Sequence, residues 1–214
     1  MRDIDVRRAL HSHLVEEHAS ERARTRFVDE LEICGEVRVD VAVLNGNFTG
    51  YELKSASDNL SRLPKQAAMY SRVFDYAVLV VAENHRRSAL AIIPSWWGVM
   101  VACTTGEGIV ELAIERPSVF NNQVEADFLV RLLWRDEALS ELTRLGLDRG
   151  VRSKPKSVLW DRLAKSVTLT DLREIVRLHL KSRTNWKVDP THSEYDGTWP
   201  SGARQWDCRQ TAFG

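Results

Sequence analysis

The sequence is poor in the features that mark several classes of protein. It has three cysteines, Cys34, Cys103 and Cys208, which lie far apart and form no Cys-X-X-Cys or Cys/His pattern. This usage is typical of a reducing compartment and argues against a zinc-binding or disulfide-based scaffold. Net charge is also lacking, because 30 Lys and Arg residues balance 30 Asp and Glu residues. Such a balance argues against a protein that coats nucleic acid through bulk charge, but it leaves room for a local basic groove.

Long hydrophobic runs are missing as well. No apolar stretch is long enough to cross a bilayer, and Arg2, Asp3 and Asp5 interrupt the start of the chain, where a signal sequence would need apolar residues. We therefore expect a cytoplasmic protein without a membrane partner. The sequence has no glycine-rich ATP-binding loop, so coupling to a motor would have to come from a partner protein.

What is present centres on residues 37–74. Valine alternates with other residues over 37–44 and predicts a largely apolar strand with Asp40 at its centre. Asn45-Gly46-Asn47 predicts a tight reversal of the chain. The next predicted strand, Thr49 to Ser55, carries Glu52 and Lys54 two positions apart, hence on one face. An antiparallel pair of strands can bring Asp40 close to that face.

Two carboxylates and an ammonium group on an otherwise apolar sheet would be costly to bury without a cation or a substrate. Two carboxylates, a backbone carbonyl and water molecules form a ligand set that suits Mg²⁺. A lysine beside the ion can orient or help to deprotonate a water molecule, or stabilise charge on a phosphate. The pattern therefore predicts metal-assisted chemistry at a phosphate.

An Asp on one strand followed by Glu-X-Lys on the next resembles the core of the PD-(D/E)XK nuclease superfamily. Gln66 and Tyr70 form Gln-X-X-X-Tyr on the following predicted helix, which is similar to an additional motif of the RecB-like branch. The proline before the aspartate, from which the superfamily takes its name although the position is often not proline, is absent from Arg38-Val39-Asp40. The stretches 93–98 and 132–137 are also similar to uncharacterised bacterial proteins, which would extend the resemblance over most of the chain.

The resemblance implies an α/β fold, with a restriction-endonuclease-like mixed central sheet flanked by helices (an αβββαβ-type core) and a C-terminal helical extension. It also implies a Mg²⁺- or Mn²⁺-dependent deoxyribonuclease that hydrolyses DNA, in DNA repair or in defence against foreign DNA. The implied catalytic residues are Asp40, Glu52, Lys54, Gln66 and Tyr70, and the implied metal ligands are Asp40, Glu52, the Leu53 carbonyl and Glu30. Glu32 is the alternative to Glu30, and a third option is that neither glutamate binds the metal. Gln66 and Tyr70 would orient either the substrate or Lys54.

Several basic residues are candidates for DNA contacts. Arg62 and Lys65 belong to the predicted helix that carries Gln66, and Arg152, Lys154 and Lys156 form a basic linker. From residue 144 to residue 187 the chain has twelve Lys and Arg against four Asp and Glu. Two short helices are predicted there, Ser157 to Ser166 and Thr170 to Arg183, with Thr170 as the cap of the second. Such a pair either lies close to DNA or forms a helical cap on the core.

The remaining elements are predicted from periodicity and turn residues. Ser57-Asp58-Asn59 is expected to cap the helix that carries Gln66, and Trp96 and Trp97 are expected to pack in the core rather than stack on bases. The predicted helices are Asp3 to Ala19, Ser20 to Ile33 and Glu125 to Leu145; the predicted strands are Asp75 to Ala82 (buried and parallel), Ala89 to Ile93, Gly98 to Cys103 and Ile109 to Ile114.

The expected organisation is a nuclease-like domain at 1–146, a basic helical extension at 147–187 and an irregular tail at 188–214. A homodimer, or a motor or repair partner, is expected because many nucleases of this type act in pairs or in complexes. Two alternatives remain at this stage. One is a non-cleaving nucleic-acid-binding or scaffold protein that keeps the fold, and the other is a metal-independent regulatory or protein-interaction domain.

Overall fold

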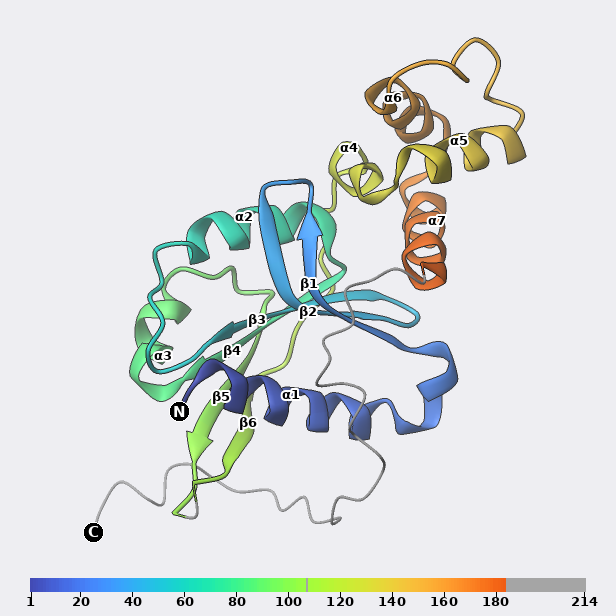
Figure 1. Cartoon of the computed structure of the whole chain (residues 1–214). Helices are drawn as coiled ribbons and strands as arrows, with labels where there is room; N and C mark the ends of the chain where they lie inside the picture. Colours follow the sequence, from blue (N-terminus) through green and yellow to red (C-terminus); the bar gives the residue numbers. More distant parts are fainter. Residues whose placement is uncertain (107, 184–214) are drawn as a thin grey trace.

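The computed structural model describes residues 1–106 and 108–183, which form a mixed six-stranded sheet flanked by helices and followed by a helical region (Figure 1). The strands, in both sequence and spatial order, are β1 (Arg26–Ile33), β2 (Val37–Leu44), β3 (Phe48–Lys54), β4 (Tyr76–Ala82), β5 (Gly98–Thr104) and β6 (Val110–Arg116). The helices are α1 (Asp3–Glu17), η1 (Ala19–Arg24), α2 (Leu63–Val73), α3 (Glu83–Leu90), α4 (Ala126–Leu129), η2 (Val130–Leu132), α5 (Arg135–Arg144), α6 (Lys156–Ser166) and α7 (Leu169–Ser182).

The order of elements confirms the predicted fold class. Strands β1, β2 and β3 are antiparallel neighbours, β4 is parallel to both β3 and β5, and β6 is antiparallel to β5. The order α1-β1-β2-β3-α2-β4 is the predicted αβββαβ core. The predicted buried parallel strand at 75–82 is confirmed as β4, since every residue from Ala77 to Ala82 is buried.

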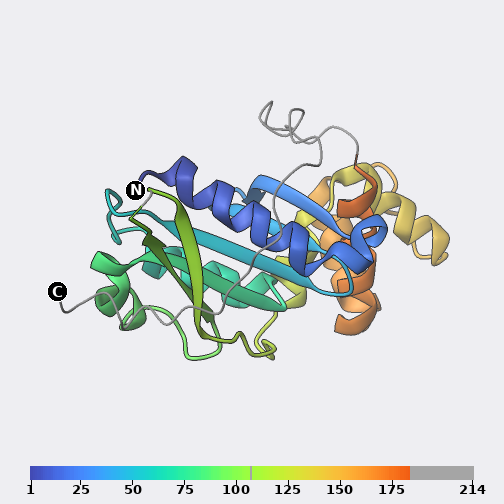
Figure 2. The ribbon, with the colours of Figure 1, turned by 90° about the horizontal axis from the view of Figure 1, so that it is seen from below.

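Two hydrophobic cores lie on opposite faces of the sheet. Helix α1 covers one face with Val6, Leu10 and Leu14, and Figure 2 shows it running along the sheet. Helix α2 covers the other face, and the buried leucines of α6 and α7 belong to the same core cluster as Tyr70 of α2. The C-terminal helices are therefore packed on the α2 side of the sheet, next to the strand ends.

The predicted helix from Ser20 to Ile33 is wrong. The chain instead forms the short η1 and then β1, which pairs with β2 from Arg26↔Leu44 to Ile33↔Val37. Glu30 has a φ of 55°, which interrupts the pleat in mid-strand. Because of this break, Val28 and Leu31 face the same core although they are three residues apart. That spacing is typical of a helix, and sheet pairing overrides it.

Two other predicted elements differ from the structure. The predicted strand from Ala89 to Ile93 is the end of α3 followed by a turn, in which the N–H groups of Ile92 and Ile93 donate to the Ala89 carbonyl. Pro94 then prevents continuation of the helix. The predicted helix from Glu125 to Leu145 is broken into α4, η2 and α5 by extended backbone at Leu133 and Trp134.

Two predicted caps are also wrong. Helix α2 begins only at Leu63 with Pro64 in its first turn, while Asp58 accepts hydrogen bonds from the backbone N–H and hydroxyl of Ser55. Helix α7 is capped by Thr168 rather than Thr170, and the Thr168 hydroxyl accepts from the Asp171 N–H at 3.1 Å. A cap depends on where the chain turns, and side-chain preference alone does not determine this.

The expectation for the tryptophan pair is confirmed for Trp97, which is fully buried and stacks on Tyr70 with 5.2 Å between ring centroids. The predicted tail at 188–214 lies outside the described residues. Within the described part of the chain, none of the helices combines the length and the apolar character needed to span a bilayer.

The close approach of β3 to the helix side makes Gly50 a sensitive position. A Cβ atom at Gly50 would lie 2.9 Å from the Phe74 ring, which is itself buried against Phe48 and Tyr70. We expect Gly50→Ala to lower the free energy of unfolding by about 1–3 kcal/mol in urea denaturation, because the core is overpacked. The control is Gly46→Ala in the β2–β3 turn, where a Cβ would meet nothing within 4 Å. Equal stability of the two variants would contradict this packing.

Candidate active site

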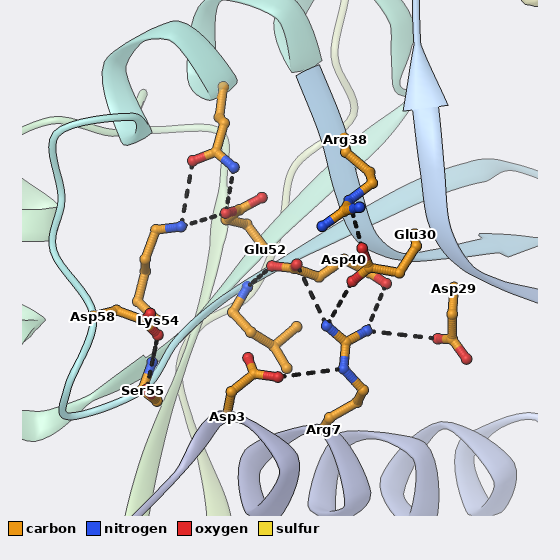
Figure 3. A network of polar contacts seen from close by, with 12 residues as sticks. Asp3, Arg7, Asp29, Glu30, Arg38, Asp40, Glu52, Lys54, Ser55 and Asp58 are labelled. Carbon is orange, nitrogen blue, oxygen red and sulfur yellow. Dashed lines mark hydrogen bonds and ion pairs between the residues drawn. The ribbon is translucent and has the colours of Figure 1, made fainter. Parts of the chain in front are cut away.

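The acidic and basic residues predicted from β2 and β3 lie together. The two strands pair from Leu44↔Phe48 to Val41↔Tyr51. Asp40 and Glu52 are the next residues of the two strands beyond this last pair. Figure 3 shows their carboxylates close together, with Lys54 beyond Glu52 on the same strand. The Leu53 N–H donates to Asp40 Oδ2 at 2.8 Å, which fixes one carboxylate against the next strand. Glu52 is 1% exposed and Lys54 is 3% exposed.

Helix α2 supplies the remaining predicted catalytic residues. The Tyr70 hydroxyl donates to Glu52 Oε2 at 2.6 Å, and Gln66 Nε2 donates to Glu52 Oε1 at 2.5 Å. Lys54 Nζ donates to Glu52 Oε1 and also to Gln66 Oε1, the latter at 3.3 Å. The structure therefore brings Glu52, Lys54, Gln66 and Tyr70 into one buried network, with Asp40 beside it.

Burial shapes the protonation of this site. Burial, and then the negative charge of Glu52, raise the pKa of Asp40 to about 7, although the Leu53 N–H and Arg7 act in the opposite direction. Burial and the neighbouring Glu52 carboxylate also raise the pKa of the Tyr70 hydroxyl well above its usual value. Tyr70 therefore remains a hydrogen-bond donor at neutral pH, and the Glu52 charge disfavours ionisation of Asp40.

Arg7 of α1 is a site residue that the sequence analysis missed. Its guanidinium donates to the Asp40 carbonyl at 2.9 Å and to Glu30 Oε1 at 3.0 Å, and it lies 3.5 Å from Asp40 Oδ1 (Figure 3). Asp3 and Asp29 also lie within 4 Å of it. Burial lowers the pKa of Arg7, but the surrounding carboxylates outweigh this effect and raise it. No short-range motif links Arg7 to Asp40, which is 33 residues away.

Glu30 lies near the site but is engaged elsewhere. One of its carboxylate oxygens bonds Arg7, and the other bonds Arg38. Glu32, the alternative, is exposed and lines the same cavity as Asp40. Over the described residues, no group of three or more His, Cys, Asp or Glu side chains is arranged to hold a metal ion. A metal ion here would therefore depend on Asp40 and Glu52 together with the Leu53 carbonyl and water.

A cavity of about 1500 Å³ opens over this network. It extends from Asp40, Glu52 and Lys54 to residues of α5 and α6, so the sheet and the C-terminal helices both form its walls. Arg62, Lys65 and Lys156, three of the predicted DNA-contacting residues, line it.

The other two predicted DNA-contacting residues, Arg152 and Lys154, are not part of this cavity lining as far as the structure describes it. Arg152 instead forms an ion pair with Asp148 at 2.6 Å. The backbone carbonyls of Arg152 and Lys154 accept hydrogen bonds from Arg135.

Fold and site define a mixed α/β protein in which two adjacent strands and a helix build a buried acid–lysine cluster. The family model described as bacteriophage P4 protein cII matches residues 1–190, and the chain belongs to this family. This is a different family from the PD-(D/E)XK superfamily that the motifs resemble.

Comparison with solved structures gives two distant neighbours. The chain is similar to SPO1766, a protein of unknown function from Silicibacter pomeroyi, with 17% identity and a TM-score of 0.38, over 63% of this chain and 88% of that one. It is also similar to SfsA from Pyrococcus furiosus, whose structure was solved in complex with Ca²⁺, with 16% identity and a TM-score of 0.29, over 48% and 58% of the two chains. A search of curated proteins gives no match.

The Tyr70 hydroxyl provides a test of the buried network. Tyr70→Phe keeps the ring that stacks on Trp97 but removes one donor from a buried carboxylate. We expect a loss of about 1–3 kcal/mol in the free energy of unfolding at pH 7, measured by urea denaturation. The matched variant is Tyr76→Phe, whose hydroxyl has no hydrogen bond among the described residues and which should change stability by less than about 0.5 kcal/mol. Similar losses in both variants would contradict the network.

Proposed function

We propose that the protein is a metal-dependent nuclease that hydrolyses phosphodiester bonds of DNA with Mg²⁺ or Mn²⁺. The observation that carries this proposal is the buried Glu52 carboxylate beside the part-buried Asp40 carboxylate, with Lys54 on the same strand as Glu52 and with Gln66 and Tyr70 bonded to Glu52 from α2. An arrangement of charges that is costly to bury is typical of a functional site rather than of a structural core.

The residues present fit a divalent cation. Burial and then the Glu52 charge raise the pKa of Asp40, so a cation bound between the two carboxylates would offset both effects. Asp40, Glu52 and the Leu53 carbonyl would hold the ion, which leaves coordination positions for water and a phosphate oxygen. When bound, the ion would lower the pKa of a bound water molecule and neutralise charge on the phosphate.

The side chains around the two carboxylates have different proposed roles. Among the described residues Lys54 has two acceptors, Glu52 and Gln66, so one of its three N–H groups remains for a water molecule or a phosphate oxygen. Gln66 and Tyr70 hold the Glu52 carboxylate in one orientation. Arg7 holds Asp40 through its carbonyl and faces its carboxylate. Glu30, whose oxygens both bond arginines, is left outside this proposed ligand set.

The proposed reaction is simple hydrolysis. The oxygen of a water molecule bonds to phosphorus, one P–O ester bond breaks, and the departing sugar oxygen receives a proton. DNA is the proposed substrate because Gln66 and Tyr70 resemble the motif of the RecB-like branch. The proposed setting is cytoplasmic, in DNA repair or in defence against foreign DNA, as a homodimer or with a motor or repair partner.

A second candidate is a protein that binds nucleic acid without cutting it. The observation that favours it is the number of donors on Glu52, because Lys54, Gln66 and Tyr70 already satisfy its carboxylate within the chain. Such a network is complete without a metal ion, so the fold could retain it for structural reasons alone.

Cleavage assays distinguish the two candidates. Purified protein is incubated with single-stranded and duplex DNA in Mg²⁺, in Mn²⁺ and in a chelator, and products are resolved on denaturing gels. We expect metal-dependent cleavage by the wild type and a loss of at least about a hundredfold in Asp40→Asn and Lys54→Ala, because each substitution removes a group that acts on the reacting atoms.

The control is Lys165→Ala, which removes an exposed lysine that pairs with Asp161 on α6. It should cleave as the wild type does. Cleavage that persists equally in Asp40→Asn and Lys54→Ala would contradict the proposed site. Salt-sensitive DNA binding without any cleavage would favour the second candidate.

A further inference from the structure

The cavity over the acid–lysine cluster has a second wall that the proposed chemistry does not use. This wall comes from η2, from the start of α5 and of α6, and from the residue that follows α7. Its cationic and aromatic residues are Arg131, Trp134, Arg135, Lys156, Trp160 and Arg183. The C-terminal helices therefore face the catalytic strands across one shared cavity.

Trp134 is the prominent residue of this wall, because it is both exposed and held in place. Its side chain is 54% exposed, although tryptophan is usually well buried. Its backbone N–H donates to Glu137 Oε2 at 2.7 Å, and this hydrogen bond holds Trp134 at the N-terminus of α5, where the backbone is extended. The Arg183 guanidinium lies 4.2 Å from the centre of the ring.

The support behind Trp134 is itself buried. Arg183 donates to both Glu137 oxygens, at 2.7 and 2.6 Å, and to the Leu132 carbonyl at 2.6 Å. A bidentate ion pair thus fixes the position of the guanidinium that lies against the ring. An aromatic ring that faces a cavity on such a support is pre-organised for a flat ligand, because little side-chain freedom is left to lose on binding.

Other aromatic rings of the helical region are paired with cations in the same way. Lys156 Nζ lies 5.0 Å from the centre of the Trp160 ring, and the Trp160 indole N–H donates to the Leu133 carbonyl at 3.1 Å. Arg131 lies 4.5 Å from the centre of the Phe128 ring. Each pair places a positive charge beside an aromatic face.

The two walls differ in charge. The strand and α2 side of the cavity has more carboxylates than cations, because Arg38, Lys54, Arg62 and Lys65 face Asp3, Asp29, Glu30, Glu32, Glu36, Asp40, Glu52 and Asp58. The helical side has more cations than carboxylates, with four cations against Asp127 and Asp161. The helical wall is therefore the more favourable of the two for a polyanion. A divalent cation bound at the strand side would make the approach of a phosphate there more favourable.

From this arrangement we propose that the cavity binds single-stranded nucleic acid, with an unpaired base stacked on Trp134 and neighbouring phosphates near Arg131 and Lys156. Bases inside a duplex are covered on both faces by their neighbours, so only an unpaired or extruded base offers a face to Trp134. The cavity of about 1500 Å³ exceeds the 300–1,000 Å³ that is usual for small-molecule pockets and suits an extended ligand. This inference rests on the proposed function and names the form of its substrate.

The test is binding without turnover. The full chain is titrated into a fluorescein-labelled oligothymidine of about 20 nucleotides, long enough to fill one binding groove, in a chelator at fixed salt, and anisotropy is followed. We expect Trp134→Ala to weaken binding roughly tenfold and Trp134→Phe to retain most of the affinity, because stacking needs an aromatic face. Blunt duplex of the same length should bind more weakly and should be insensitive to Trp134→Ala.

The matched control is Phe120→Ala, which removes a partly exposed aromatic ring that contacts Tyr76 and Arg173, away from the cavity. It should leave binding unchanged, and thermal unfolding of all variants confirms that each is folded. Unchanged single-strand binding in Trp134→Ala, or an equal loss on duplex, would overturn the proposal. Because no cleavage is required, loss of stacking and loss of catalysis are separate results: a binder that does not cleave would refute the proposed function alone.

Discussion

The structure depends on one unfavourable arrangement, the part-buried Asp40 carboxylate next to the fully buried Glu52 carboxylate. Burial and the neighbouring Glu52 charge disfavour the ionised form of Asp40. The fold compensates with donors from three directions: Arg7 from α1, Lys54 from β3, and Gln66 and Tyr70 from α2. Removing any of them would leave a charge with too few partners in a region of low polarity.

This compensation explains why the elements are ordered as they are. The antiparallel β2–β3 hairpin brings Asp40 and Glu52 together, and the parallel crossover from β3 to β4 returns α2 over the same strands. Helix α1 approaches from the opposite face of the sheet and places Arg7 against Asp40. Tyr70 of α2 and the buried leucines of α6 and α7 belong to one core cluster, so the site and the C-terminal helices share one supporting core.

The arrangement of β2, β3 and α2 could be predicted from the sequence, because it depends on patterns that extend over only a few residues. Alternating valines gave β2, the Asn-Gly-Asn turn gave the hairpin, and a spacing of four placed Gln66 and Tyr70 on one side of a helix. The segment that forms β1 was predicted as a helix because Val28 and Leu31 are three residues apart, a spacing typical of one helix face. In the structure the positive φ of Glu30 shifts the alternation of side chains, so both residues face the same core from a strand. Sheet pairing decided that segment, and it depends on residues far away in the chain.

Other features could not be predicted, because they depend on contacts between distant segments. Arg7 meets Asp40 only after α1 folds across the sheet. Trp134 becomes an exposed ring because the chain breaks there, and Arg183, 49 residues later, supports it. Arg152 and Lys154, in contrast, were predicted to contact DNA from local charge alone. In the structure Arg152 pairs with Asp148, and the carbonyls of Arg152 and Lys154 accept from Arg135, so these contacts stabilise the turn after α5.

We propose that the Asp40 and Glu52 carboxylates together bind a divalent cation. Isothermal titration of Mn²⁺ into the wild type and into Asp40→Asn tests it without any substrate. We expect saturable binding at one site in the wild type and its loss in the variant. We also expect proton release near neutral pH, since metal binding requires a deprotonated Asp40, whose pKa is raised to about 7. Absence of binding in the wild type, or equal binding in the variant, would contradict the proposal.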